Sequence, residues 1–292
     1  CYNIYVKYCN KTEKKGDIIM LLKTLVENTS ISSSFQHKHG ICFYIEVENH
    51  KILFDLGPND LFIENAKKMN VDLKQIDTVI ISHGHVDHAG ALQSFLKINH
   101  QAKIYVRENA FEEHFNKFLG IQKNIGIEPE LKNHPQIILT QQQTIINDNM
   151  ILFSNIKTKK FLPQANLSLY KKENNQFVLD DFTHEQSLII KEGKKRILIS
   201  GCSHAGIINI KNAAENLIKE KLTHVIGGFH LYNPVSHRYE KQEFINQLAN
   251  QLKQQPIQYY TCHCTGQKAF NILKNHLQQQ IHYLSTGSIL EL

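Results

Sequence analysis

SHGHVDHAG, at residues 82–90, is the stretch from which the fold of this chain is most directly predicted. It follows an apolar, β-branched run at residues 76–81 and precedes a segment with helical spacing at residues 91–98, a pattern typical of a strand-to-helix loop. Its histidines and aspartate carry the ligand groups that zinc and related divalent ions prefer. His83 and His85 can bind one ion, and Asp87 and His88 lie where a second ion would bind. A merely polar, histidine-rich surface loop would not explain why the ligand order, the strand and the glycine occur together.

The composition is that of a globular protein with a large core. The 292 residues are 41% hydrophobic, which is enough for one sizeable α/β domain or two small ones. No run approaches the roughly 18 apolar residues of a membrane helix, so we expect a soluble protein without a membrane partner. The net charge of +6 is spread along the chain. It slightly favours anionic small-molecule substrates and argues against a nucleic-acid partner.

The cysteines and the first residues bear on compartment and domain boundaries. Six cysteines in a chain of this length do not form a dense disulfide framework, so a reducing compartment, and hence the cytoplasm, is expected. Residues 1–19 contain neither the apolar segment nor the cleavage site of a signal peptide. We expect them to be an N-terminal extension before a natural start at Met20, with residues 20–292 forming a single domain. An added edge strand over residues 4–8 is the alternative.

Strands and helices alternate along most of the chain, and the β-branched strands are too apolar to face water. This pattern predicts a four-layer αββα sandwich, in the α+β or α/β class, with the site along one edge. Strands are predicted at residues 21–26, 41–47, 51–54, 76–81, 103–106, 187–191, 196–200, 223–226 and 257–261, with two more around Gly287. Helices are predicted at residues 58–69, from 90 onwards, and at 108–118, 205–219, 239–253 and 267–277.

Two segments are less regular. The polar loop at residues 30–40 could reach a site from the side. Residues 119–180 contain short predicted strands at 136–139, 150–153 and 176–179, and they either shape a substrate pocket or form a solvent-facing β-excursion. We interpret His114 and His134 as ordinary surface histidines.

The HxHxDH pattern of residues 82–90 resembles the signature of the metallo-β-lactamase superfamily, and the resemblance extends from about Met20 to the end of the chain. Within that superfamily the chain looks like the branch of metal-dependent hydrolases similar to 7,8-dihydropterin-6-yl-methyl-4-(β-D-ribofuranosyl)aminobenzene 5′-phosphate synthase. The closer resemblance lies in LVEN at residues 25–28, HG at 39–40, FDLG at 54–57, GCSHAG at 201–206, GGFHL at 227–231 and HCTG at 263–266.

The resemblance implies further ligands at strand ends in the second half. His204 is the best candidate for the next ligand, and His263 matches the final histidine ligand of the superfamily. A zinc finger around His263 is a weak alternative, because its flanking cysteines lack a second Cys/His pair at finger spacing. Many superfamily members have a metal-bridging aspartate where this chain has Cys202. A thiolate there could bind, bridge or merely pack, and occupancy of the second metal position depends on which of these it does.

Three more residues receive roles with alternatives. His184 could take the position of the third superfamily histidine, or its loop could support the ligands from behind. Asp55 matches an aspartate that supports the histidine loop through hydrogen bonds, although a turn aspartate is the alternative. His230 follows two glycines that allow close backbone approach to a ligand. It would contact substrate or transfer a proton, or else cap its loop.

These residues predict a metal-dependent hydrolase with two divalent ions, zinc in the first place and manganese or iron as alternatives. Asp87 would orient the attacking water and His230 would protonate the leaving group. The expected substrate is a small anionic metabolite such as a phosphoester or a pterin-linked phosphoribosyl compound. Alternatives are a synthase that expels pyrophosphate, an RNA nuclease and an iron-dependent oxidoreductase on the same fold. A homo-oligomer is compatible with the sequence.

Overall fold

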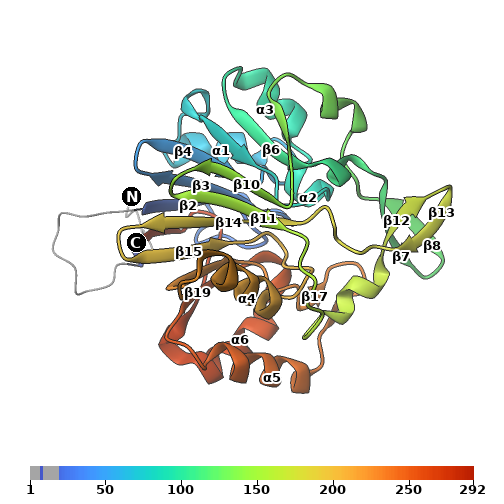
Figure 1. Cartoon of the computed structure of the whole chain (residues 1–292), viewed down its shortest axis with the longest axis vertical. Helices are drawn as coiled ribbons and strands as arrows, with labels where there is room; N and C mark the ends of the chain where they lie inside the picture. The colour runs from blue at the N-terminus through green and yellow to red at the C-terminus, as the bar shows by residue number, and fades with distance from the viewer. Residues whose placement is uncertain (1–6, 9–19) are drawn as a thin grey trace.

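Two large β-sheets packed face to face, with helices on both outer faces, form the body of the computed structural model, which describes residues 7–8 and 20–292 (Figure 1). These four layers confirm the predicted αββα sandwich. The first sheet contains, in order, β1 (Lys7–Tyr8), β21 (Ile289–Glu291), β2 (Met20–Val26), β3 (Cys42–Val47), β4 (His50–Phe54), β5 (Thr78–Ile80), β6 (Lys103–Arg107) and β9 (Ile137–Thr140). The second contains β10 (Gln143–Asn147), β11 (Met150–Ser154), β14 (Gln186–Glu192), β15 (Lys195–Ile199), β16 (His224–Gly227), β19 (Gln258–Thr261) and β20 (Ile281–Tyr283).

Two smaller sheets and the helices complete the described chain. The smaller sheets contain β13 (Gln176–Leu179), β12 (Leu169–Glu173), β7 (His114–Phe118) and β8 (Ile121–Asn124), and β17 (Tyr232–Asn233) with β18 (Arg238–Tyr239). The α-helices are α1 (Leu61–Lys68), α2 (Val86–Ala89), α3 (Leu92–Ile98), α4 (Ile207–Ile218), α5 (Gln242–Leu252) and α6 (Gln267–Leu277). The 3-10 helices are η1 (Leu73–Gln75), η2 (Glu108–Phe111), η3 (Pro129–Asn133), η4 (Gln164–Ser168), η5 (His263–Thr265) and η6 (Gln278–Gln280). Within the described ranges, no helix combines the length and the apolar character needed to cross a membrane.

The strands are apolar on both faces because each large sheet packs against the other sheet on one face and against helices on the other. On β15, Ile197 and Ile199 enter the apolar layer between the sheets, whereas Leu198 joins the layer shared with α4, α5 and α6. On β3, Phe43 faces the other sheet and Tyr44 faces the layer shared with α1 and α3. Alternate residues of a strand point to opposite faces, so a strand buried on both faces has a continuous apolar sequence.

Parallel strand pairs place the functional loops at one edge. Strands β4, β5 and β6 are parallel neighbours in the first sheet, as are β15, β16 and β19 in the second. The loops that follow parallel neighbours emerge at the same edge of a sheet. Asp55, residues 82–88, residues 201–206, His230 and His263 all follow these strands, so they meet at that edge.

Two predictions for residues 108–118 are wrong. A single helix was expected, but the chain forms the short η2 and then β7, which pairs antiparallel with β12 some 50 residues later. His114 was interpreted as a surface residue, yet its side chain is completely buried. Along β7 the burial alternates with period two, which is typical of a strand with one covered face. His134, by contrast, lies half-buried after η3.

The alternative edge strand near the N-terminus is described only in part. Lys7 and Tyr8 pair in parallel with Ile289 and Leu290 of β21. The other residues predicted for it, and the rest of the proposed extension before Met20, lie outside the described residues. The start at Met20 and the single domain over residues 20–292 stay predictions.

Candidate metal centre

His83, His85 and His204 form the first candidate metal-binding group. The rings of His83 and His204 face each other with no proton between them. His83 Nδ1 donates to Ser82 Oγ (2.8 Å), because that hydroxyl itself donates to Asp55 Oδ2 (2.7 Å). His204 Nδ1 donates to Asn166 Oδ1 (3.0 Å), and the Asn166 amide is oriented by its bond to the His204 carbonyl. Both rings therefore carry their proton on Nδ1, and their Nε2 atoms lie 3.3 Å apart. Two lone pairs at that distance form a site for a cation.

His85 completes this group. Its Nε2 atom is buried and has no hydrogen-bond partner among the described residues. Ligand atoms of His83, His85 and His204 all lie within 4.8 Å of one another. Burial, together with the neighbouring imidazoles, lowers the pKa of each ring well below its ordinary value, so the nitrogens stay unprotonated and able to bind a metal.

Asp87, His88, Cys202 and His263 form the second group, again with ligand atoms within 4.8 Å of one another. His88 Nδ1 donates to Asp55 Oδ2 (2.7 Å), and its Nε2 lies 3.1 Å from Cys202 Sγ. His263 Nδ1 faces Asn28 Oδ1 (2.8 Å), whose amide nitrogen bonds the His263 carbonyl. The His263 Nε2 lone pair is therefore directed at the Asp87 carboxylate, 3.2 Å away. A carboxylate facing a lone pair likewise requires a cation between them.

The charges of this group are set by its neighbours. Burial alone would raise the pKa of the Asp87 carboxyl group. The nearby imidazoles outweigh this effect and hold the pKa of Asp87 well below its usual range. For His88, burial is outweighed by Asp55 and Asp87, which raise its pKa to about 9. A metal-free centre therefore holds a proton on His88 that a divalent ion would have to displace.

Cys202 lies where the two groups meet. Its sulfur belongs to the second group and also lies within 4.8 Å of ligand nitrogens of His204 and His230. Burial raises the pKa of the Cys202 thiol well above its ordinary value. A coordinated thiol is deprotonated, so a divalent ion would have to displace this proton as well as the one on His88. The position is the one expected for a bridging ligand.

His230 points into the same space. Both of its ring nitrogens are buried and lack a hydrogen-bond partner among the described residues, and its ring centroid lies 4.2 Å from that of His204. Its backbone φ is +51°, in the left-handed region that non-glycine residues seldom adopt. A strained backbone and two free buried nitrogens are typical of a functional side chain.

Two carboxylates act from behind the ligands. Asp55 accepts three hydrogen bonds of 2.7 Å, from the Ser82 amide and hydroxyl and from His88 Nδ1, which tie it to the histidine loop. Glu185 accepts from the backbone amides of His204 (2.7 Å) and Ala205 (2.9 Å). Burial raises the pKa of Glu185 to about 7.

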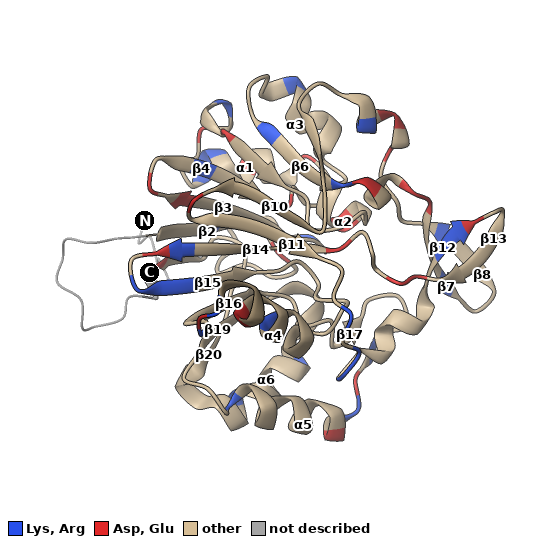
Figure 2. Cartoon of the chain, in the orientation of Figure 1, with Lys and Arg blue, Asp and Glu red and all other residues tan. Residues whose placement is uncertain are grey.

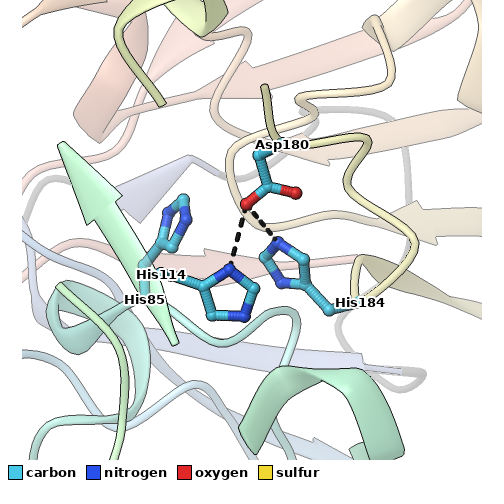
Figure 3. Close-up of side chains that lie close together, drawn as sticks. All are labelled: His85, His114, Asp180 and His184. Carbon is cyan, nitrogen blue, oxygen red and sulfur yellow. Dashed lines mark hydrogen bonds and ion pairs between the residues drawn. The ribbon is translucent and has the colours of Figure 1, made fainter. Parts of the chain in front are cut away.

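His184 lies behind the first group rather than beside His83 and His204. Its ligand atom lies within 4.8 Å of those of His85, His114 and Asp180 (Figure 3). The part played by His114 was missed in the sequence because its partner Asp180 is 66 residues away.

His39 was also not singled out as a site residue. Its Nε2 lies 3.3 Å from Asp87 Oδ2, and its ring centroid lies 4.3 Å from that of His263. The next residue, Gly40, has φ of +148°, and a Cβ there would lie 2.4 Å from the Asp87 carbonyl oxygen. Only glycine allows this approach, so the HG pair at residues 39–40 was the available signal.

A cavity of about 430 Å³ opens onto both groups. Asp87, Cys202 and His230 are among the residues that line it, together with residues of β7, β8 and 233–235, and the lining is largely apolar. Lys123 is the single Lys or Arg among the described lining residues. The volume suits a small molecule.

The chain resembles a protein family, two individual sequences and a solved structure. Residues 39–153 match the family described as the metallo-beta-lactamase superfamily. The 7,8-dihydropterin-6-methyl-4-(beta-D-ribofuranosyl)-aminobenzene-5'-phosphate synthase of Methanocaldococcus jannaschii is 29% identical over 292 residues, covering 95% of this chain and 98% of that protein. A second protein of the same organism, Uncharacterized protein MJ0448, is 30% identical over 261 residues, covering 87% of this chain and 93% of that protein.

A solved structure extends the similarity to three dimensions. The crystal structure of Tm1679, described as a metal-dependent hydrolase of the beta-lactamase superfamily, shares 27% identity and a TM-score of 0.78 with this chain. The alignment covers 94% of this chain and 99% of that one.

Proposed function

Because this chain belongs to the metallo-β-lactamase superfamily, we propose that it is a hydrolase that binds two divalent metal ions and attacks its substrate with an activated water. The observation that carries the proposal is the 3.3 Å approach of the His83 and His204 Nε2 atoms, both unprotonated. Three imidazoles form one position, and Asp87, His88, His263 and Cys202 form the other. A thiolate with imidazoles favours zinc, with manganese and iron as the alternatives.

Divalent ions held by these residues would lower the pKa of a bound water to near 7 and polarise the bond under attack. Asp87 lines the cavity beside both positions, so its carboxylate orients that water by accepting its hydrogen bond. His230 has free ring nitrogens within the same cavity, and it supplies a proton to the leaving group or holds an anionic group of the substrate.

The substrate that fits this cavity is a small anionic metabolite with an apolar part. The lining offers apolar surface for an organic group, and Lys123 offers one positive charge. A phosphoester or a pterin-linked phosphoribosyl compound has this chemistry. The four described cysteines are free and buried, which supports a reducing compartment such as the cytoplasm.

A synthase is the second candidate, supported by the similarity to the M. jannaschii protein over nearly its whole length. The same centre would then assist a condensation that expels pyrophosphate. A nuclease is less well supported, because Figure 2 shows Lys and Arg on several separate elements of the described chain, with Asp and Glu among them.

The test is to measure metal content by elemental analysis and then to screen activity. Protein purified without chelators should contain two equivalents, and His85→Ala should lose most of them. The wild type should release nitrophenolate from bis(p-nitrophenyl) phosphate, and His85→Ala should not. Release of pyrophosphate from a dihydropterin pyrophosphate together with an aminobenzene ribofuranosyl phosphate would instead identify the synthase. A chain that binds no divalent ion would contradict both candidates.

A further inference from the structure

Four buried side chains behind the centre could be mistaken for a third metal site. His85, His114, Asp180 and His184 bring ligand atoms within 4.8 Å of one another (Figure 3). His114 comes from β7, and Asp180 and His184 come from the segment between β13 and β14. The ring of His85, which belongs to the first metal group, has its centroid 5.4 Å from that of His184 and 5.7 Å from that of His114.

The hydrogen bonds of His184 exclude it as a ligand here. The Gly84 amide donates to His184 Nδ1 (3.0 Å), so this nitrogen carries the lone pair. The ring proton is then on Nε2, which donates to Asp180 Oδ2 (3.2 Å). A neutral imidazole has one lone pair, and in His184 the Gly84 amide occupies it.

His114 and Asp180 are also hydrogen-bonded. Both nitrogens of His114 face acceptors, Asp180 Oδ2 at 3.0 Å and the Asn109 carbonyl at 3.1 Å. The second oxygen of Asp180 accepts from the Phe182 amide at 2.8 Å. Asp180 therefore determines which nitrogen of His184 is protonated, and that choice makes Nδ1 an acceptor.

Gly84 is the residue between the two metal-binding histidines, and it is held from two sides. A Cβ on Gly84 would lie 2.2 Å from the Ala110 carbonyl oxygen, so η2 packs directly against its backbone. His184 binds its amide from the other side. Two residues later in the loop, the Val86 amide donates to the Ile125 carbonyl (2.7 Å).

We infer that His184 and Asp180 are positioning residues: His184 binds no metal but fixes the Gly84 peptide, and with it the directions of His83 and His85. This inference rests on the proposed metal centre. Of the two roles that the sequence left open for His184, it selects support of the ligands from behind over the position of a third ligand. Residues that orient metal ligands in this way commonly change metal affinity 10–100-fold when they are replaced.

Two polar substitutions separate the two hydrogen bonds. In His184→Asn the side-chain oxygen occupies the place of Nδ1, so it can still accept from Gly84. In His184→Gln the amide group lies one bond further out, near the place of Nε2, so it can bond Asp180 but leaves Gly84 without an acceptor. His50→Gln is the matched control, because His50 pairs with Asp77 (3.1 Å) at the start of β4, the end of that strand away from the centre.

The measurement is the zinc dissociation constant of the metal-free full-length protein, by competition with a chromophoric chelator, together with zinc stoichiometry and urea unfolding of the metal-free form. We expect His184→Gln to bind zinc about 10–100-fold more weakly, and His184→Asn and His50→Gln to stay within about threefold of the wild type. All four proteins should bind two equivalents.

Three results would overturn the inference. Equal zinc affinity in all variants would show that the Gly84 contact does not position the ligands. Equal weakening in His184→Asn and His184→Gln would show that the acceptor at Nδ1 is not what matters. Three equivalents in the wild type, with one lost in both His184 variants, would show that the cluster itself binds metal. If the wild type binds no zinc, the proposed function fails first, which is distinct from each of these results.

Discussion

His83 and His204 direct unprotonated Nε2 atoms at each other across 3.3 Å, and each ring is held in that state by a hydrogen bond at Nδ1. This arrangement is unfavourable without a cation. Removal of metal should therefore lower the melting temperature, and zinc at about 100 times its Kd should restore roughly 2.7 kcal/mol of unfolding free energy. Calorimetry of the metal-free and reloaded protein measures this. An unchanged melting temperature on adding zinc would contradict a preformed centre.

Cys202 is expected to hold both ions. Its sulfur lies within 4.8 Å of ligand atoms from each group. Cys202→Ala should therefore lower the metal content from two equivalents towards one, whereas Cys202→Asp, with a shorter reach but an anionic oxygen, should retain more of the second ion. Elemental analysis of both variants decides this. Two full equivalents in Cys202→Ala would mean that the thiol only packs.

The metal-free protein should lose stability as the pH rises through 9. The pKa of His88 is raised from an ordinary 6.5 to about 9 because Asp55 and Asp87 outweigh the effect of burial. The protonated ring therefore stabilises the fold fully below pH 6.5, and this contribution disappears between pH 6.5 and 9.

The difference in unfolding free energy between the wild type and Asp55→Asn separates the His88–Asp55 interaction from the other titrating groups. It should shrink by roughly 3 kcal/mol across that range. Urea unfolding of both metal-free proteins at pH 6 and at pH 9.5 measures the change. A constant difference would show that His88 is neutral throughout.

Gly84→Ala should lower the free energy of unfolding far more than Gly120→Ala. The added methyl group would lie 2.2 Å from the Ala110 carbonyl oxygen, and neither backbone can move freely. We expect a loss of about 3 kcal/mol from overpacking, together with weaker metal binding. Gly120→Ala is the control, because at φ +80° it meets no atom within 4 Å and should cost only about 1 kcal/mol of backbone strain. Similar losses in the two variants would contradict the steric argument.

Lys123→Ala should affect binding more than chemistry. The ammonium group lines the cavity on β8 but does not belong to either metal group. For an anionic phosphodiester we expect KM to rise about three- to tenfold with kcat nearly unchanged, because the charge stabilises bound substrate and transition state alike. The effect should weaken at high salt. Steady-state kinetics would disagree with this assignment if kcat fell and KM did not change.

Local sequence was sufficient for the motif and most of the elements around it. The apolar run before Ser82 and the polar ligands after it predicted a strand that ends in a metal loop, since both patterns lie within a few residues. The strand ends before His204 and His263 were found in the same way. Whether His204 or His184 faces the first group depended on which nitrogens their neighbours bond, and sequence spacing does not contain that information.

The errors lie where partners are distant along the chain. His114 looked like a surface residue on a helix, but β12 pairs with its strand and Asp180 bonds its ring, both more than 50 residues later. His39 reached the centre because a loop folds back onto Asp87. The sequence by itself therefore determined the superfamily, the layered fold and the ligand types, because short-range hydrophobic pattern and motif order specify them. Only the tertiary structure decided which imidazoles direct unbonded nitrogens into the two candidate groups and which are hydrogen-bonded at both nitrogens behind them, because burial and hydrogen-bond direction are properties of residues brought together from distant segments.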